Sequence, residues 1–202
     1  MKKITLYFLL LLAYPSLAQN DFLLRINDTT IEIGMDQVYE LLIDGKPVEF
    51  ELQTKDTLLF SDPLYTFNYP KGFSLSRLEV EQGIEQIMLM TAEGSGVLIQ
   101  KYASMDPSGM KEMMLSEITK ESLNYGYEMK RKDYDLKLVN GDKLRVMKAV
   151  LTYRGEKMTY EVAALGGKDQ GVLIITMITN EEFSEKGKAL IEMMWATLNP
   201  LF

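Results

Sequence analysis

The chain of 202 residues contains no cysteine and no histidine. The absence of Cys excludes disulfide bonds, thiolate nucleophiles and cysteine-ligated zinc or iron–sulfur sites. The absence of His excludes Ser-His-Asp and Cys-His catalytic arrangements and imidazole metal ligation. Carboxylate, Lys, Tyr, Ser and Thr chemistry remains, and no motif built from these residues names a reaction. We therefore expect a protein that is not an enzyme, with no catalytic, cofactor-binding or metal-binding residues.

Long apolar runs are also scarce, and the one at the N-terminus has the pattern of a secretory signal. Two lysines precede an apolar run over residues 4–13, and Ser16-Leu17-Ala18 supplies small residues before a cleavage site. We expect a signal peptide over residues 1–18, cleavage before Gln19, and a periplasmic or extracellular mature protein. The run is shorter than the roughly 18 residues of a membrane-spanning helix, so a retained anchor is the lesser alternative. No later run is long enough, so we expect no stable membrane insertion after cleavage.

Basic side chains are in the minority, with 22 Lys+Arg against 29 Asp+Glu and a formal charge of −7. Removing residues 1–18 takes away two lysines and no acidic residue, which leaves −9. Nucleic-acid binding rests on basic patches that neutralise phosphates, so we expect no nucleic-acid partner. Anionic lipid surfaces are disfavoured for the same reason.

The remaining chain separates into two parts. Residues 19–61 contain short strand patterns and no convincing helix, which predicts a small N-terminal β segment. Its clearest element is a hairpin around Asp44-Gly45, which places Tyr39 opposite Phe50 and Leu41 opposite Val48. A short helix over residues 36–44 is the competing interpretation.

The second part, residues 62–202, has the strand and helix order of an α+β domain. Nearly continuous apolar runs over residues 84–90 and 97–102 predict central strands that are covered on both faces. A later antiparallel meander turns at Asn140-Gly141-Asp142, which pairs Leu138 with Leu144. It turns again at Gly155-Glu156, which pairs Leu151 with Tyr160.

Two helices are expected to cover the sheet. The first runs over residues 108–125, with Met110, Met113, Met114, Ile118 and Tyr125 on its buried side. The second runs over residues 181–198, with Asn180 as its N-cap and Phe183 on its buried side. The expected fold class is therefore α+β, an antiparallel sheet covered by helices in an α/β/α sandwich and preceded by a small β appendage.

Residues from about 64 to 202 resemble the PsbP-like fold family. The resemblance rests on the Tyr69-Pro70-Lys71-Gly72-Phe73 element, a hairpin, one helix, an antiparallel meander, and a terminal helix that ends in Trp195-Ala196-Thr197-Leu198. The family includes the photosystem II extrinsic P-subunit, a Ran-binding import factor and bacterial envelope proteins. It implies a non-catalytic binding or accessory module. No functional residue carries over, because the chain has no His for the metal contacts of the photosynthetic members.

Two glycine motifs resemble catalytic or phosphate-binding loops. Gly94-Ser95-Gly96 has Glu93 where a nucleophile elbow needs its first glycine, and no His is present as a base. Gly166-Gly167-Lys168 lacks the earlier glycine of a phosphate loop and is followed by Asp169 rather than Ser or Thr. We interpret both as turns.

Two groups of charged residues could also form a functional site. Glu81 and Glu85 could form the carboxylate pair of a glycosidase, but such pairs arise by chance in a chain this acidic, so we expect solvated surface charge. Lys130-Arg131-Lys132 adjoins Asp133 and Asp135, which favours a solvated loop over an anion site.

Methionine is unusually frequent, with 14 in the chain and 13 after residue 1. Thioethers ligate Cu(I), so a site around Met110 and Met114 is conceivable. We favour core filling, because these residues sit on the predicted apolar faces.

Together these features predict a secreted or periplasmic, non-catalytic binding or accessory protein whose partner is another envelope protein or a small ligand. The alternative is a carboxylate-dependent envelope hydrolase of glycosidase type. A third class, a structural subunit of an envelope assembly, would expose an apolar patch of several hundred Å².

Overall fold

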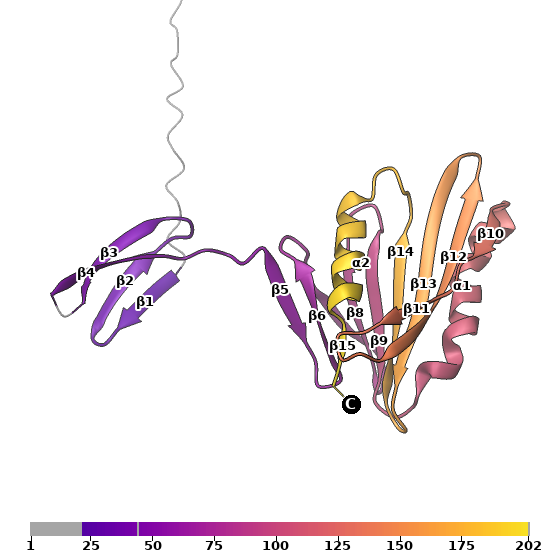
Figure 1. Ribbon diagram of the computed structural model, residues 1–202, viewed down its shortest axis with the longest axis horizontal. Coiled ribbons are helices and arrows are strands. Elements are labelled where there is room, and N and C mark those ends of the chain that lie inside the picture. Colours follow the sequence, from indigo (N-terminus) through magenta and orange to yellow (C-terminus); the bar gives the residue numbers. More distant parts are fainter. Residues whose placement is uncertain (1–21, 44, 202) are drawn as a thin grey trace, which may run out of the picture. The chain divides into compact units, whose positions relative to one another are not determined.

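The computed structural model describes residues 22–43 and 45–201. The expected signal peptide and its cleavage site lie outside the described residues, as does Asp44 of the predicted hairpin turn. The chain divides into two compact units, one through Lys55 and the other from Asp56 (Figure 1).

The first unit consists of two antiparallel hairpins. Its strands are β1 (Phe22–Ile26), β2 (Thr29–Ile33), β3 (Val38–Ile43) and β4 (Lys46–Glu51). In the second hairpin Tyr39 lies opposite Phe50 and Leu41 opposite Val48, which confirms the predicted register. The competing helix is not formed, because period-two alternation places the paired Tyr39 and Phe50 rings in a stack with centroids 5.5 Å apart.

The second unit begins with a three-stranded sheet in the order β15-β6-β5. β5 (Thr57–Ser61) pairs with β6 (Tyr65–Pro70), and the C-terminal β15 (Asn199–Pro200) pairs with the other edge of β6. The Phe60 and Phe67 rings stack across the first pair with centroids 4.9 Å apart. Because of this pairing, β5 belongs to the second unit, and the boundary lies earlier than the expected one between residues 61 and 62.

An eight-stranded antiparallel sheet forms the centre of the second unit, in the order β10-β12-β13-β14-β9-β8-β7, with β11 also pairing with β12. Its strands are β7 (Ser76–Glu81), β8 (Ile84–Met90), β9 (Gly96–Tyr102), β10 (Glu128–Arg131), β11 (Tyr134–Lys137), β12 (Lys143–Tyr153), β13 (Glu156–Gly166) and β14 (Gly171–Ile178). The β8–β9 turn requires glycine at Gly96, where φ is 154° and a Cβ would overlap the Leu89 carbonyl oxygen.

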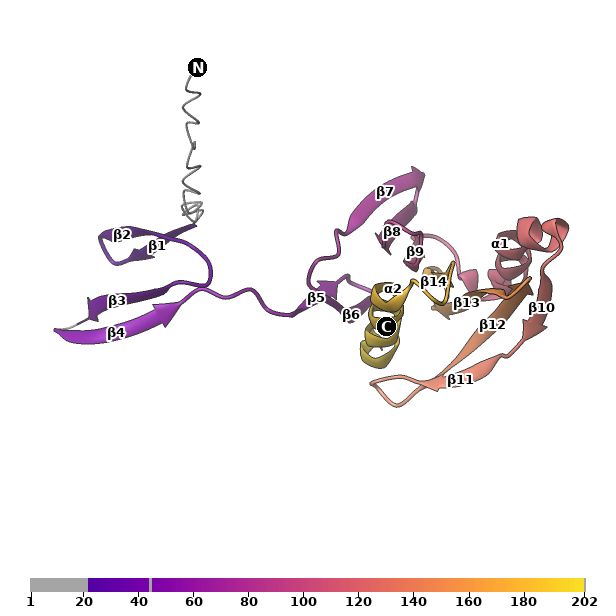
Figure 2. The ribbon, with the colours of Figure 1, turned by 90° about the horizontal axis from the view of Figure 1, so that it is seen from above.

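Helices lie on both faces of this sheet (Figure 2). α2 (Glu185–Thr197) and the three-stranded sheet cover one face, and α1 (Lys111–Tyr125), preceded by the 3₁₀ turn η1 (Pro107–Met110), covers the β12–β13 part of the other. We call these the α2 face and the α1 face. Each has its own cluster of buried apolar side chains. The predicted α+β class, an antiparallel sheet covered by helices, is confirmed.

The helix boundaries and buried sides differ in part from expectation. α1 ends at Gly126 as predicted, with φ of 112° and its N–H donating to the Leu123 carbonyl. α2 begins at Glu185 rather than at residue 181, because the Asn180 side chain accepts from the Glu182 N–H and closes a turn instead. Phe183 therefore precedes the helix and is 68% exposed.

In α1, Leu115 and Thr119 are the buried residues of the helix, while Met113 and Tyr125 are exposed, contrary to prediction. The buried side of a helix follows the 3.6-residue period through Leu115 and Thr119, and Met113 lies off that line.

Two predicted strand registers are wrong by two positions. Leu136, rather than Leu138, lies opposite Leu144, because the Leu138 N–H donates to the Asp142 carbonyl oxygen at 2.8 Å and closes the loop one residue earlier. Leu151 lies opposite Met158 rather than Tyr160. The turn there is Arg154-Gly155, with φ of 49° and 90°, a two-residue hairpin turn. A shift of two leaves every side chain on its expected face.

On the α2 face the middle of β8 and β9 is covered, because Ile87, Leu89 and Ile99 are inaccessible to solvent. Glu85 and Lys101, nearer the ends of these strands on the same face, are partly exposed. On the α1 face the side chains of both strands are partly exposed, apart from the buried Tyr102 at the end of β9, because α1 lies over β12 and β13. The prediction that both faces of these strands are covered is therefore wrong for the α1 face.

Candidate functional site

A cleft of about 390 Å³ opens on the α2 face, between α2 and the strand β11. Ligand pockets in proteins usually fall in the range of roughly 300–1,000 Å³. β11, β12, β13, β14 and α2 supply the side chains that line the cleft: Tyr134, Leu136, Lys148, Thr159, Glu161, Thr176, Ile178, Lys188, Ile191, Glu192, Trp195 and Ala196.

Glu161 is the central polar group of this cleft and is only 5% exposed. Its Oε1 accepts from Lys148 Nζ at 2.9 Å and from the Tyr134 hydroxyl at 3.2 Å. Its Oε2 accepts from Trp195 Nε1 at 2.8 Å and from Thr176 Oγ1 at 3.1 Å. The carboxylate thus accepts four hydrogen bonds, and because it offers about four lone pairs, its capacity as an acceptor is used up.

This arrangement makes Glu161 the acceptor that holds four neighbouring side chains in place. Both of its oxygens accept two hydrogen bonds each, so the lone pairs of the carboxylate are used within the protein. Burial, followed by the nearby charge of Glu161, raises the pKa of Tyr134 above its ordinary value. Tyr134 therefore remains a phenol that donates to the carboxylate.

Lys148 keeps donor capacity for a ligand. One of its three N–H groups serves Glu161, and its side chain is 30% exposed. Around it, Leu136, Ile178, Ile191 and Trp195 provide apolar walls. The cleft is therefore suited to a molecule with an apolar body and a hydrogen-bond acceptor.

The local fold explains how a glutamate comes to lie inside the sheet. β13 is buried along most of its length, and its register places Glu161 between Lys148 of β12 and Thr176 of β14. A row of three polar side chains thus crosses three strands on one face, and Trp195 of α2 completes it from above.

Sequence reasoning missed this site. One indication of the site is present in the sequence: the charged Glu161 interrupts the otherwise apolar run over residues 160–165. The predicted register placed Glu161 opposite Val150, whereas the structure places it opposite Lys148. Because the predicted register was wrong by two positions, it did not bring Lys148 and Glu161 together as an ion pair.

The two glycine motifs are turns, as interpreted. Ser95 is buried, and its hydroxyl is within hydrogen-bond distance of the hydroxyls of Ser184 (2.7 Å) and Thr179 (3.2 Å). These hydroxyl contacts connect the β8–β9 turn to the residues just before α2. Gly167 donates to the Gln170 carbonyl in the loop between β13 and β14.

The structure does not bring Glu81 and Glu85 together. Glu81 pairs across β7 and β8 with Ile84, and the next residue along β8, Glu85, points to the opposite face. Glu85 forms an ion pair there with Arg77 at 3.1 Å. These two carboxylates therefore cannot flank one glycosidic bond.

The basic cluster at Lys130 and Arg131 lies in strand β10, which pairs with β12, so the predicted loop is wrong there. Neighbouring acidic side chains balance its charge. Arg131 contacts Glu112 at 3.0 Å and Asp133 at 2.8 Å. The hydrogen bond from Arg131 lowers the pKa of the Asp133 carboxyl below its ordinary value. These contacts are those of a surface ion-pair network.

Metal-ligating groups were sought over residues 22–43 and 45–201. No three or more Asp or Glu side chains in that part of the chain form a group that could hold a metal ion. Met110 and Met114 pack, partly buried, against the core of the α1 face, as predicted for core filling.

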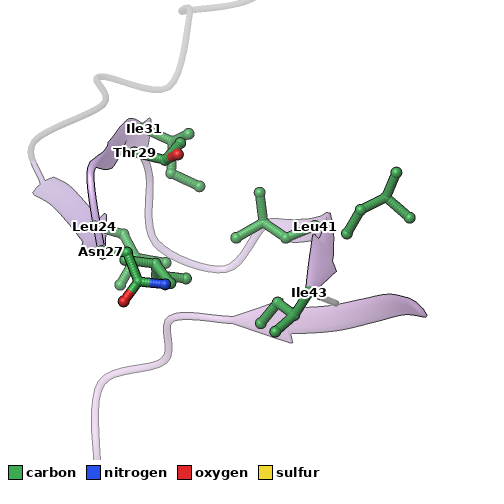
Figure 3. A pocket seen from close by; sticks show the side chains of 8 residues that line it. Leu24, Asn27, Thr29, Ile31, Leu41 and Ile43 are labelled. Carbon is green, nitrogen blue, oxygen red and sulfur yellow. The ribbon is translucent and has the colours of Figure 1, made fainter. Parts of the chain in front are cut away.

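The first unit has a smaller cavity of about 170 Å³ between its two hairpins, where Leu24, Ile31 and Leu41 project beside Asn27 and Thr29 (Figure 3). Leu23, Val38 and Leu42 of this unit are 71%, 68% and 73% exposed. The unit therefore presents apolar side chains to its surroundings on small sheets that bury little.

Comparison with known proteins gives a likeness of fold. The structure is similar to the solution structure of cyanobacterial PsbP (CyanoP) from Synechocystis sp. PCC 6803, with 10% identity and a TM-score of 0.46 over 72% of this chain and 92% of that one. It is also similar to a crystal structure from Bacteroides thetaiotaomicron VPI-5482, with 12% identity and a TM-score of 0.33. The match covers 72% of this chain and 48% of that one, about half of its length.

No family model and no curated protein matches the chain. The fold family that the sequence resembles is thus also that of a similar solved structure, and the likeness concerns the fold alone. Among the described residues, no helix has the length and apolar character needed to cross a membrane.

Proposed function

We propose that the mature chain is a non-catalytic binding or accessory protein of the periplasm or the cell exterior. It binds a small amphiphilic ligand, or an apolar segment of another envelope protein, in the cleft between α2 and β11. The observation that carries the proposal is the saturated carboxylate of Glu161 at the centre of an apolar-walled cleft.

The cleft supports binding more than catalysis. Its buried carboxylate holds four donors in place, which fixes the walls without supplying a reactive group. Lys148 is the group that a ligand acceptor would meet, and Trp195 is the largest apolar side chain among the residues that line the cleft with it. The exposed Leu23, Val38 and Leu42 of the first unit support an accessory role, because such side chains are typical of contact surfaces.

Trp195 is the only tryptophan of the chain, so its fluorescence reports on the cleft directly. The test is to titrate the chain from residue 19 with medium-chain fatty acids, the matching alkylamines and alcohols, and hydrophobic dipeptides. We expect a saturable change in Trp195 emission with acceptor-bearing members and a weaker one with the amines, which Lys148 repels.

The matched control uses one substitution at two exposed alanines of α2. Ala196→Trp would obscure the signal, so Ala196→Leu is used to narrow the cleft, and Ala189→Leu is placed in a different hollow. Ala196→Leu should weaken binding by about tenfold, or about 1.4 kcal/mol, and Ala189→Leu should leave it unchanged. Equal binding by both variants would place the ligand elsewhere.

The hydrolase alternative rests on Glu192, a second carboxylate that lines the same cleft. It predicts turnover of an envelope glycan or ester that Glu192→Gln abolishes. Turnover of this kind, without any change in Trp195 emission on adding the amphiphiles, would replace the binding proposal with the hydrolase.

A further inference from the structure

The α1 face of β7, β8 and β9 lies beyond the helix that covers the rest of that face (Figure 2). Cross-strand pairing identifies its side chains, because residues directly opposite each other share a face. Leu98 lies opposite Met88, which lies opposite Ser76, and Gln100 lies opposite Gln86, which lies opposite Leu78. We call these six residues the open face.

The open face is partly exposed yet carries no charge. Leu78 is 53% exposed, and Gln86, Met88, Leu98 and Gln100 are each partly accessible. In a mature chain with a formal charge of −9, an exposed sheet surface without Asp, Glu, Lys or Arg is unexpected.

The opposite side of the same strands has the reverse character. Arg77, Glu79, Glu85 and Lys101 alternate with the open-face residues and point toward the α2 face. Lys101 forms an ion pair there with Asp62 at 2.7 Å. Charge therefore lies on the side that the protein itself partly covers, and the side left uncovered is neutral. A surface of this kind is typical of one that a partner covers.

Acidic residues flank the open face on two sides. Glu81 pairs with Ile84 at the end of β7 and so lies on the α1 face. On α1, Glu112 contacts Arg131 of β10, which sets that side of the helix toward β10. Helical periodicity then places Glu117 and Glu121 on the other side, toward β14 and β9. Glu117 is exposed and only loosely paired with Lys120 at 3.6 Å.

The dimensions fit one further helix. A helix with its side chains is about 10 Å across, and neighbouring strands are about 4.8 Å apart, so one helix covers about two strands. α1 covers β12 and β13, and η1 contacts β13 and β14 next to it, which leaves β9, β8 and β7 without a helix over them. Met88 adds a flexible thioether, and such side chains adapt to different apolar partners.

We propose that the open face binds an amphipathic helix of a partner protein, with its apolar side on Met88 and Leu98 and with Lys or Arg along its flanks. The basic flanks would meet Glu81, Glu117 and Glu121. This site is distinct from the α2-face cleft, and its occupant would complete the helical layer that α1 begins.

The test uses a synthetic helix-forming peptide with leucines on one side and lysines on its flanks, and a second peptide in which every lysine is glutamate. Methyl-labelled methionines report the contact, and Trp195 fluorescence reports the other face. We expect the basic peptide to shift the Met88 methyl signal in a saturable way while Trp195 emission and the signal of the exposed Met129, on the edge strand β10, stay unchanged. The acidic peptide should bind at least about tenfold more weakly, since like charges oppose it.

Two matched variants each introduce one lysine, the first within the open face and the second away from it. Leu78→Lys should weaken the basic peptide by about tenfold, and Val139→Lys, at a position 63% exposed in the loop between β11 and β12, should leave its binding unchanged. Glu117→Lys with Glu121→Lys should weaken it by about threefold and reduce its salt dependence.

Three results would overturn the proposal. They are equal binding of both peptides, binding that Leu78→Lys does not affect, and absence of binding by the folded wild-type chain. A dimer in sedimentation that Leu78→Lys dissociates would make a second copy of the chain the occupant instead. Loss of binding here leaves the Trp195 titration untouched, so the two proposals fail separately.

Discussion

The two faces of the large sheet differ in how completely their side chains are buried. On the α2 face, a helix and a second sheet seal the core, and Leu190, Met194 and Leu198 have no exposed surface. On the α1 face, one helix covers the β12–β13 part of the sheet, and partly buried methionines such as Met147, Met158 and Met177 pack against the core. The comparison teaches that the sealed face holds a shaped cleft with a fixed polar centre, whereas the other keeps an adaptable surface.

The largest expected effect comes from the same substitution made on each face. Met194→Ala removes a fully buried side chain, and we expect it to lower the free energy of unfolding by about 3 kcal/mol. Met88→Ala removes a partly exposed one and should cost about 1 kcal/mol or less. Urea unfolding followed by circular dichroism measures both. Equal losses would remove the distinction between the faces.

The next prediction concerns the polar centre of the sealed face. Glu161→Gln replaces two acceptor oxygens by one and sets an amide donor against Lys148 or Trp195. We expect a loss of about 2 kcal/mol in unfolding free energy. Glu192→Gln, at an exposed residue of the same cleft, is the control and should change stability by less than about 0.5 kcal/mol. A neutral Glu161→Gln would show that the four hydrogen bonds are not maintained in solution.

Methionine oxidation compares the faces without mutation. Dilute peroxide should convert the exposed Met113 first, the partly exposed Met88 next and Met194 last, because oxidation requires access to the sulfur. Peptide mass spectrometry over a time course gives the order. We expect the Met88 rate to exceed that of Met194 by about tenfold or more. Early oxidation of Met194 in the folded chain would contradict a sealed α2 face.

The smallest expected effect is the pH dependence at the edge of the α2 face. The hydrogen bond from Lys157 to Glu181, at 2.7 Å, lowers the pKa of the Glu181 carboxyl below its ordinary value of 4.5. A lowered folded-state pKa contributes stability above pH 4.5, and that contribution is lost as pH falls through the folded-state value.

Glu181→Gln should therefore cost less than about 1 kcal/mol at pH 7, and its difference from the wild type should vanish in acid. Paired urea titrations at neutral and acidic pH measure it. Glu182→Gln, one residue along and exposed, serves as the control. A difference that persists below the folded-state pKa would assign the effect to packing.

Much of the fold follows from local patterns in the chain. The Tyr39–Phe50 hairpin register, the end of α1 at Gly126 and the alternation of layers rest on turn chemistry and periodicity, which act over a few residues. The PsbP-like resemblance likewise depends on element order. The start of α2 was less predictable, because the Asn180 side chain favours a turn as readily as a helix cap.

The candidate site could not be predicted, because its parts come from distant elements. Lys148, Glu161, Thr176 and Trp195 become neighbours only when three strands are in register and α2 lies over them. When a predicted register is wrong by two positions, every side chain still lies on its correct face of the sheet. The cross-strand partners nevertheless change, so the predicted partner of Glu161 was Val150 instead of Lys148. Burial of a face is also nonlocal, which is why the partial exposure of β8 was missed.

The most direct test of the central claim is one NMR experiment that reads both faces at once, through the Trp195 indole N–H and the Met88 methyl group. An acceptor-bearing amphiphile should shift the indole signal alone, and the basic helical peptide should shift the methyl signal alone. The account predicts two independent, saturable responses in one folded chain. A single ligand that shifts both signals with the same concentration dependence, or neither ligand shifting either, would contradict it.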